Sequence, residues 1–360
     1  MKNDNQEKIS GNILLFYAFD LGDDIEIFSI KNKNLVLLYE KAPSPFFKNY
    51  HIPLSFKLTA EKNKETIERK DCIASKIYHF GVVSLCYKIP FESNFDDLRQ
   101  KLIELKNEYD TQSNIDAKNV FKKIGPAIKK PHFYNLKSDY YAVQVNPIGK
   151  EASGKEFREK YGTKILPLLR LETKLLSEYQ KNEILSSVTG YYGQDFIIID
   201  SEASFIYDTE YNEPMEILEL TNVQQLELHY YDWLLDNKLN YFYMQKSLTP
   251  PWTAYIPLIG QRFQQPASKL ASLRVDISVI TERLENSIKI TGDAYFLQLY
   301  SMLVAKLGLK DWRESINRKL EIIWNLHQVH IDNLNSLHSE ILELVIIILI
   351  ALEAIIAFYH

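Results

Sequence analysis

Short apolar runs separated by polar turn residues dominate the first hundred residues, and this pattern is typical of β-strands. The runs cover residues 13–19, 25–30, 35–39, 51–58 and 77–87. They predict strands, or strands around one short helix. The last run is expected to be buried because β-branched and aromatic residues dominate it. Leucines then recur at helical spacing after Asn94, a suitable N-cap, and predict a helix.

A second series of elements begins with the alternating strand at 140–145 and continues with helical residues from about 151 to 186. The apolar run at 196–199 and the strand at 205–207 flank a turn and predict a hairpin. Asn212, Glu213 and Pro214 then form a good helix start, and a long helix to about Met244 is expected.

Prolines at 250, 251, 257 and 266 mark a linker, because proline disrupts a helix interior. Helices are predicted at 270–284 and at 294–307, the second ended by Gly308. Neither Pro nor Gly occurs from Asp311 onward, so one helix from Asp311 to Phe358 is expected.

Apolar residues in this long helix recur alternately every four and three residues, which is the spacing of a heptad seam. The seam comprises Ile316, Leu320, Ile323, His327, His330, Leu334 and Leu337. We interpret it as an assembly seam and expect a homo-oligomer. His327 and His330 have a spacing that suits a metal, but no further ligand completes a site, so a polar layer in the seam is favoured. A buried layer of this kind would make the association sensitive to pH.

The segment from Ile341 to Tyr359 is the most informative part of the chain. Its thirteen large apolar residues favour a bilayer by about 0.3–0.6 kcal/mol each. A charged Glu353 near the centre would cost about 2.5–3.5 kcal/mol, so insertion is favoured. The predicted membrane anchor is represented by Leu342, Glu343, Leu344, Ile347, Ile348, Glu353 and Ile355. The alternatives are a buried core helix and an oligomerisation helix.

The patterns together predict an α+β protein: a mixed α/β N-terminal body, then a helical C-terminal region that ends in a transmembrane-like helix. The two α/β segments of the body are either duplicates or unrelated. The expected divisions are a disordered N-terminus at 1–10, a first α/β segment at 11–112, a basic connection at 113–138, a second α/β segment at 139–248, a linker at 249–266, a helical hairpin or coiled coil at 267–340 and a membrane helix at 341–360.

Composition narrows the class of protein. With 47 acidic and 42 basic residues, the chain lacks the basic field of a bulk nucleic-acid binder. Its two cysteines, Cys72 and Cys86, form no disulfide framework and no CxxC motif, which favours a reducing compartment. Residues 1–10 resemble neither a secretory signal nor a transit peptide. We therefore expect a single-pass membrane protein with its N-terminal body on the cytosolic side.

A local basic stretch is the best candidate for binding an anionic partner. Lysines alternate with aromatic residues between 118 and 137, and we single out Lys122, Lys123, Lys129 and Lys130. This mixture suits RNA or anionic lipid headgroups. The alternative is a solvated inter-domain linker, which the composition favours.

No catalytic, cofactor-binding or metal motif occurs in the sequence. Walker loops, GxSxG elbows, HExxH helices and dinucleotide fingerprints are all missing. We therefore expect a non-enzymatic, membrane-anchored scaffold or interaction protein without a cofactor. The alternatives are an enzyme with an unrecognised site in the α/β body and a translation factor that contacts RNA or ribosomes from a membrane. A pocket with convergent titratable groups would favour the enzyme.

Two short stretches resemble a known family. Leu342-Glu343, the run Val345 to Ile350 and the later Glu353 resemble the ending of the required-for-meiotic-nuclear-division family, and Gly81-Val82-Val83 resembles its Gly-Val-Val strand. The resemblance implies an α/β body with a C-terminal membrane helix. It also implies, for mitochondrial members, a role in organelle translation at the inner membrane.

Overall fold

The computed structural model describes residues 8–39, 53–62, 65–134, 136–148, 153–171, 176–244, 275 and 293–359. The chain divides into two compact units, one of Met1–His229 with Leu284–Lys310 and one of Tyr230–Arg283 with Asp311–His360. The predicted proline linker at 249–266 and the predicted helix at 270–284 lie outside the described residues, apart from Val275. The first strand already begins at Ile9, inside the stretch predicted to be disordered.

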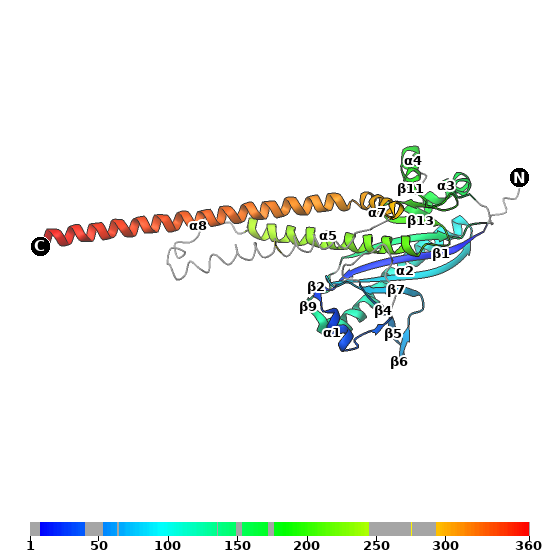
Figure 1. Ribbon diagram of the computed structural model, residues 1–360, viewed down its shortest axis with the longest axis horizontal. Helices are drawn as coiled ribbons and strands as arrows, with labels where there is room; N and C mark the ends of the chain where they lie inside the picture. The colour runs from blue at the N-terminus through cyan, green and yellow to red at the C-terminus, as the bar shows by residue number, and fades with distance from the viewer. Residues whose placement is uncertain are drawn as a thin grey trace. The chain divides into compact units, whose positions relative to one another are not determined.

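A nine-stranded sheet forms the centre of the first unit (Figure 1), in the order β11-β12-β13-β10-β1-β8-β7-β4-β3. Its strands are β1 (Ile9–Asp20), β3 (Leu37–Leu38), β4 (Leu54–Lys57), β7 (Cys72–Ile77), β8 (Val82–Ser93), β10 (Lys137–Val145), β11 (Val188–Thr189), β12 (Phe196–Ile199) and β13 (Ala203–Tyr207). Two small two-stranded sheets accompany it. They pair β2 (Gly22–Ile25) with β9 (Ile128–Pro131), and β5 (Thr59–Lys62) with β6 (Glu65–Glu68).

The two predicted α/β segments share this one sheet. β1 belongs to the first segment and β10 to the second, and they pair antiparallel from Gly11 opposite Val145 to Phe19 opposite Lys137. The segments differ in topology: the paired strands of the first are antiparallel, whereas β10 and β13 in the second are parallel and joined through helices. Among the described elements, the strand order therefore gives no support to a duplication.

Helices cover both faces of the sheet, and strand alternation decides which side chains each helix meets. One face carries Tyr17, Tyr87 and Tyr141 and packs on α2 (Phe95–Ile124) and α3 (Gly154–Arg170). The other face carries residues such as Ser138, which contacts α5 (Asn212–Met244). The sheet is consequently buried on both sides, which explains its nearly continuous apolar strands.

Helix α2 corrects the prediction for residues 113–138. The helix begins where expected, because the Asn94 side chain accepts a hydrogen bond from Asp97 N at 2.9 Å. It then continues for 30 residues to Ile124 and is followed by a short 3₁₀ turn, η1 (Gly125–Ala127), and by β9. The basic stretch is thus folded into helix and strand. It is not a connection between two domains.

The remaining helices largely follow the sequence pattern. They are α1 (Ile27–Asn32), α4 (Glu178–Ser186), α7 (Ala294–Lys306) and α8 (Leu309–Tyr359). Gly308 adopts a φ of 63° between α7 and α8, as expected of a helix stop. The α+β architecture is confirmed, with a sheet-rich N-terminal body and a helical C-terminal region that ends in an apolar helix.

In the second unit, the C-terminal part of α5 packs along α8. Lys319 Nζ lies 2.7 Å from Asp232 Oδ1 and 2.7 Å from Asp236 Oδ1. The buried apolar side chains of the pair are Tyr231, Leu235 and Leu239 on α5, with Ile316, Leu320 and Ile323 on α8. This spacing of three and four residues is that of two helices packed through one face.

Candidate functional site

The apolar end of α8 is the clearest candidate site. Residues Ser339–Phe358 form a helix with a mean hydropathy of 2.9, and none of it is buried within the chain. Twenty residues at about 1.5 Å each give about 30 Å, the thickness of a bilayer core. By length and composition, this helix is able to cross a membrane. The exposed side chains include Leu342, Leu344, Ile347, Ile348 and Ile355 of the predicted anchor.

The backbone conformation of this segment differs from the local preference of its residues. Val345 to Ile348 are β-branched and would favour a strand on a half-buried surface. They instead continue a helix, which satisfies every backbone hydrogen bond within the segment and is therefore suited to lipid. Glu343 lies in the first turns of the apolar stretch. Glu353 lies five residues before Phe358, towards the other end.

The predicted assembly seam is divided by the structure. Ile316, Leu320 and Ile323 are buried within this single chain, on the stretch of α8 where Ser315 and Lys319 contact Asp232 of α5, so they are already covered without a second copy. The side chains of His327, His330, Leu334 and Leu337 lie outside the part that the structure describes, although their backbone belongs to α8. The polar layer predicted for the two histidines stays a prediction.

Two of the four lysines of the predicted anionic-partner patch lie next to acidic groups. Lys130 Nζ lies 2.7 Å from Asp23 Oδ2, and Lys129 Nζ lies 3.8 Å from Asp24 Oδ2 across the β2–β9 strand pair. Lys123 Nζ donates to Thr59 Oγ1 at 2.9 Å. Lys122 lies in the last turn of α2. Asp23 and Asp24 thus offset the charges of Lys130 and Lys129, the two lysines of the patch that lie on β9.

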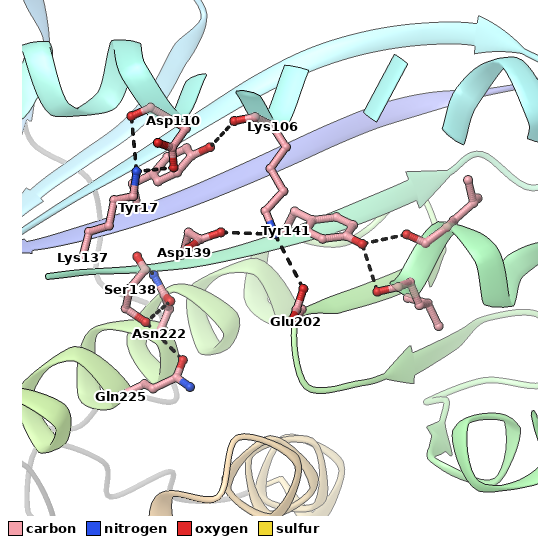
Figure 2. Close-up of polar contacts among 12 residues, drawn as sticks. Tyr17, Lys106, Asp110, Lys137, Ser138, Asp139, Tyr141, Glu202, Asn222 and Gln225 are labelled. Carbon is pink, nitrogen blue, oxygen red and sulfur yellow. Dashed lines mark hydrogen bonds and ion pairs between the residues drawn. The ribbon is translucent and has the colours of Figure 1, made fainter. Parts of the chain in front are cut away.

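Strand β10 carries a group of polar contacts on both faces of the sheet (Figure 2). On the α2 face, Lys137 pairs with Asp110, and Lys106 Nζ lies 3.4 Å from Asp139 Oδ2 and 3.6 Å from Glu202 Oε2. The Tyr141 hydroxyl reaches the carbonyl oxygens of Leu168 and Leu169 at 2.7 and 2.9 Å, at the end of α3. These contacts fasten α2 and α3 to the sheet.

On the opposite face, Ser138 holds α5. Its hydroxyl lies 2.8 Å from Asn222 Oδ1 and 3.1 Å from Gln225 Oε1, and Asn222 Nδ2 donates to the Ser138 carbonyl at 3.2 Å (Figure 2). Lys76 and Glu219 form a buried ion pair between β7 and α5. Because these buried groups already have partners, we interpret the two faces of β10 as structural attachment and not as a reaction centre.

A third polar cluster joins β7 and β8 to α2. Arg69 donates two hydrogen bonds to Asp71, at 2.9 and 2.6 Å, and Tyr109 donates to Asp71 Oδ2 at 2.9 Å. The bonds from Arg69 lower the pKa of Asp71. Behind them, Tyr87 donates to Asp116 Oδ2 at 2.9 Å, and burial raises the pKa of Asp116. No spacing in the sequence signals this cluster, because its members lie on separate elements.

The described residues were searched for metal-ligand clusters and reactive thiols. No group of three or more His, Cys, Asp or Glu residues there could hold a metal ion. Cys72 and Cys86 are both free thiols, and Cys86 is buried. Burial raises the pKa of the Cys72 thiol, which makes it a poor nucleophile.

The sheet-rich body matches a known protein family. The family described as uncharacterized protein MJ0711, N-terminal domain, matches residues 10–213, which is more than half of the chain. The chain belongs to this family. The match runs from the first residues of β1 to the start of α5, so it includes all nine strands of the sheet.

Two curated proteins are similar to this chain. Uncharacterized protein MJ0711 of Methanocaldococcus jannaschii is 27% identical over 192 residues, which are 53% of this chain and 57% of that protein. A protein named monofunctional glycosyltransferase from Staphylococcus haemolyticus is 27% identical over 198 residues, which are 50% of this chain and 72% of that protein. The chain thus spans just over half the length of MJ0711. No solved structure is significantly similar. The resemblance to the required-for-meiotic-nuclear-division family stays a prediction.

Proposed function

We propose that this protein is a membrane-anchored interaction protein whose α/β body is held at a membrane by the end of α8. One observation carries the proposal: twenty consecutive residues, Ser339–Phe358, present apolar side chains outward along the whole helix with none of the segment buried. An exposed apolar surface of this size is unfavourable in water and marks a membrane or protein contact. The three acidic residues of the stretch, Glu340, Glu343 and Glu353, reduce the gain from insertion without cancelling it.

We place the body on the cytosolic side. Arg318 and Lys319 precede the apolar helix on the side of the body. Positive residues near a span favour the cytosolic side. The free thiols of Cys72 and Cys86 suit a reducing compartment.

Alkaline extraction of membranes tests the anchor. The full chain should stay in the membrane pellet after carbonate washing, and a chain that ends at His338 should be released. A matched full-length variant, Ile347→Lys with Leu349→Lys, should also be released, because two charges in the centre cost about 5–7 kcal/mol on the insertion scale. A double variant outside the apolar stretch, Asn317→Lys with Asn325→Lys, should stay in the pellet. If the full chain and the truncated chain are both soluble, the anchor is wrong.

We further propose that copies associate through α8 beyond Ile323, because the earlier seam residues are already buried within a single chain. The α/β body would remain available to bind a protein or an RNA partner at the membrane. Chemical cross-linking of the full chain in membranes tests self-association. A dimer band that persists after dilution into excess lipid supports it, and a purely monomeric pattern contradicts it.

An enzyme is the second candidate, favoured by the name of one relative, monofunctional glycosyltransferase. The similarity covers half of this chain, so it supports a test of glycosyl transfer and no assignment of residues. Sugar transfer from activated donors by the purified full chain would support the enzyme. Retention at the membrane without transfer would favour the interaction protein.

A further inference from the structure

Two exposed tyrosines lie in the turn between β11 and β12, and neither the membrane anchor nor the polar clusters use them. Tyr191 and Tyr192 are 49% and 71% exposed. The Asp195 carboxylate holds the turn, because it accepts hydrogen bonds from Tyr191 N at 2.7 Å and from Tyr192 N. An added Cβ at Gly190 would lie 2.5 Å from the Asp195 carbonyl oxygen, so the turn closes tightly on itself. A constrained backbone thus presents both rings to solvent.

A third ring joins this pair from α7. Tyr191 lies edge-on to Tyr192, with ring centroids 4.6 Å apart, and edge-on to Tyr295, with centroids 5.3 Å apart. Tyr295 belongs to the first turn of α7, which contacts β11 and β12 (Figure 1). The three rings form one aromatic surface, and Tyr192 is its most exposed member. Tyrosine is a common anchor residue in protein interfaces, and the face of its ring attracts cations.

Three carboxylates surround the aromatic surface. β12 and β13 are antiparallel partners, so Asp195, just before β12, and Asp208, just after β13, lie at the same edge of the sheet. Asp293 is the N-cap of α7 and accepts a hydrogen bond from Tyr295 N at 2.9 Å. Burial raises the pKa of Tyr295, and the carboxylates of all three aspartates raise it further. The Asp293 carboxylate also raises the pKa of Tyr191. Rings and carboxylates therefore belong to one site.

The negative charge of this site is not offset by basic side chains in the described part of the chain. Asp195 and Asp208 accept hydrogen bonds from backbone N–H groups, which carry no net charge. Asp293 is stabilised by the start of α7, but a helix end carries only about half a unit charge. The local sequence is consistent with a negative field: no Lys or Arg occurs between Lys181 and Lys238, whereas twelve Asp and Glu do. The surface therefore suits a cationic partner.

We propose that this surface binds an arginine-containing segment of a protein partner. The guanidinium plane would stack on Tyr192, and its N–H groups would face the carboxylates of Asp195 and Asp208. Arginine suits both contacts, because it stacks on aromatic rings and donates paired hydrogen bonds to carboxylates. An RNA partner is disfavoured at this surface, because the same carboxylates would repel its phosphates. The inference rests on the proposed function, since it assigns a class of partner to the interaction protein.

Fluorescence anisotropy of a labelled Gly-Arg-Gly-Arg-Gly peptide with the full chain in maltoside detergent tests the proposal. The peptide should bind, and the same peptide with citrulline in place of arginine should bind about tenfold more weakly, because citrulline keeps the shape without the charge. Tyr192→Ser should weaken binding about fivefold and Asp208→Asn about threefold. Tyr179→Ser removes an equally exposed ring from α4, and Glu108→Gln removes an exposed charge from α2. Both of these control variants should bind the peptide normally.

Several outcomes would overturn the proposal. They are absence of peptide binding to the folded protein, equal affinity for the arginine and citrulline peptides, and an equal loss in Tyr192→Ser and Tyr179→Ser. An equal loss in Asp208→Asn and Glu108→Gln would show a diffuse field in place of a site. Competition by phosphocholine as strong as that by unlabelled peptide would assign the surface to a choline headgroup instead. The anchor is not needed in detergent, so peptide binding by a chain that alkaline extraction releases would refute the anchor alone.

Discussion

Lys76 and Glu219 form an ion pair that is almost entirely withdrawn from solvent, with Nζ and Oε2 2.6 Å apart and side chains 8% and 0% exposed. The pair joins β7 in the sheet to α5, two elements 143 residues apart in the sequence. The nearby carboxylate raises the pKa of Lys76 despite burial. Lys76 therefore keeps its charge in the folded protein, and the ion pair with Glu219 compensates it.

Replacing one member of this pair should be much worse than replacing both. Lys76→Met leaves Glu219 buried and uncompensated, and the free energy of unfolding should fall by about 3–5 kcal/mol. Lys76→Met with Glu219→Leu should recover most of that loss, because two apolar side chains need no compensation. Chemical denaturation of the three proteins measures the difference. A double variant as unstable as the single one would contradict the account.

Gly81→Ala should be strongly destabilising. Gly81 has a φ of 108°, and an added Cβ would lie 1.7 Å from the Gly22 carbonyl oxygen. Backbone strain alone should lower the free energy of unfolding by about 1–3 kcal/mol, and the clash adds to it. Gly193→Ala is the control, because nothing lies within 4 Å of an added Cβ there. Equal melting temperatures for the two variants would contradict this role of Gly81.

The Asp71 cluster predicts a loss of stability in acid. Arg69 lowers the pKa of Asp71 below its ordinary value of 3.8, so the charged form stabilises the folded state. This contribution is fully present above pH 3.8 and disappears as the pH falls through the lower, folded-state pKa. Asp71→Asn removes the contribution. Between pH 5 and 2, unfolding measurements should show a smaller drop in stability for Asp71→Asn than for the unmodified protein, and parallel curves would refute the assignment.

Lys319 should matter to the helix pair of the second unit, whereas its neighbour should not. Lys319 contacts Asp232 and Asp236, and Ser315 also donates to Asp232 at 2.8 Å. Arg318 is exposed, and its ion pair is long: Nη1 lies 4.0 Å from Glu314 Oε2 on the same helix. Lys319→Met should destabilise the pair by about 1–2 kcal/mol, and Arg318→Met by less than about 0.5 kcal/mol. Urea denaturation of both variants tests this contrast, and equal effects would contradict it.

Local patterns predicted the elements well and their partners poorly. The hairpin around residues 200–204, the α5 helix and the unbroken α8 helix all follow from apolar spacing and from capping residues such as Asn94. The alternation of apolar and polar residues within 140–145 also predicted the strand β10. None of these patterns contains the information that β1 pairs with β10, because register across more than a hundred residues depends on tertiary packing.

Two predictions, for the seam on α8 and for the basic stretch of α2, depend on tertiary contacts that local patterns do not contain. Heptad spacing shows that Ile316 and Leu320 need a cover, but it does not distinguish α5 of the same chain from a second copy. The lysines at 122–130 suggested a basic linker, because their acidic partners Asp23 and Asp24 are about a hundred residues earlier in the sequence.

Spin-label depth measurements on α8 test the membrane span most directly. Single cysteines at Glu340, Leu349 and Phe358, placed in a chain with Cys72→Ser and Cys86→Ala, would carry a nitroxide in reconstituted bilayers. A spanning helix predicts the greatest collision rate with oxygen at 349 and the greatest collision rate with a water-soluble nickel complex at 340 and 358. Equal access of the nickel complex to all three positions would show that Ser339–Phe358 does not cross the membrane.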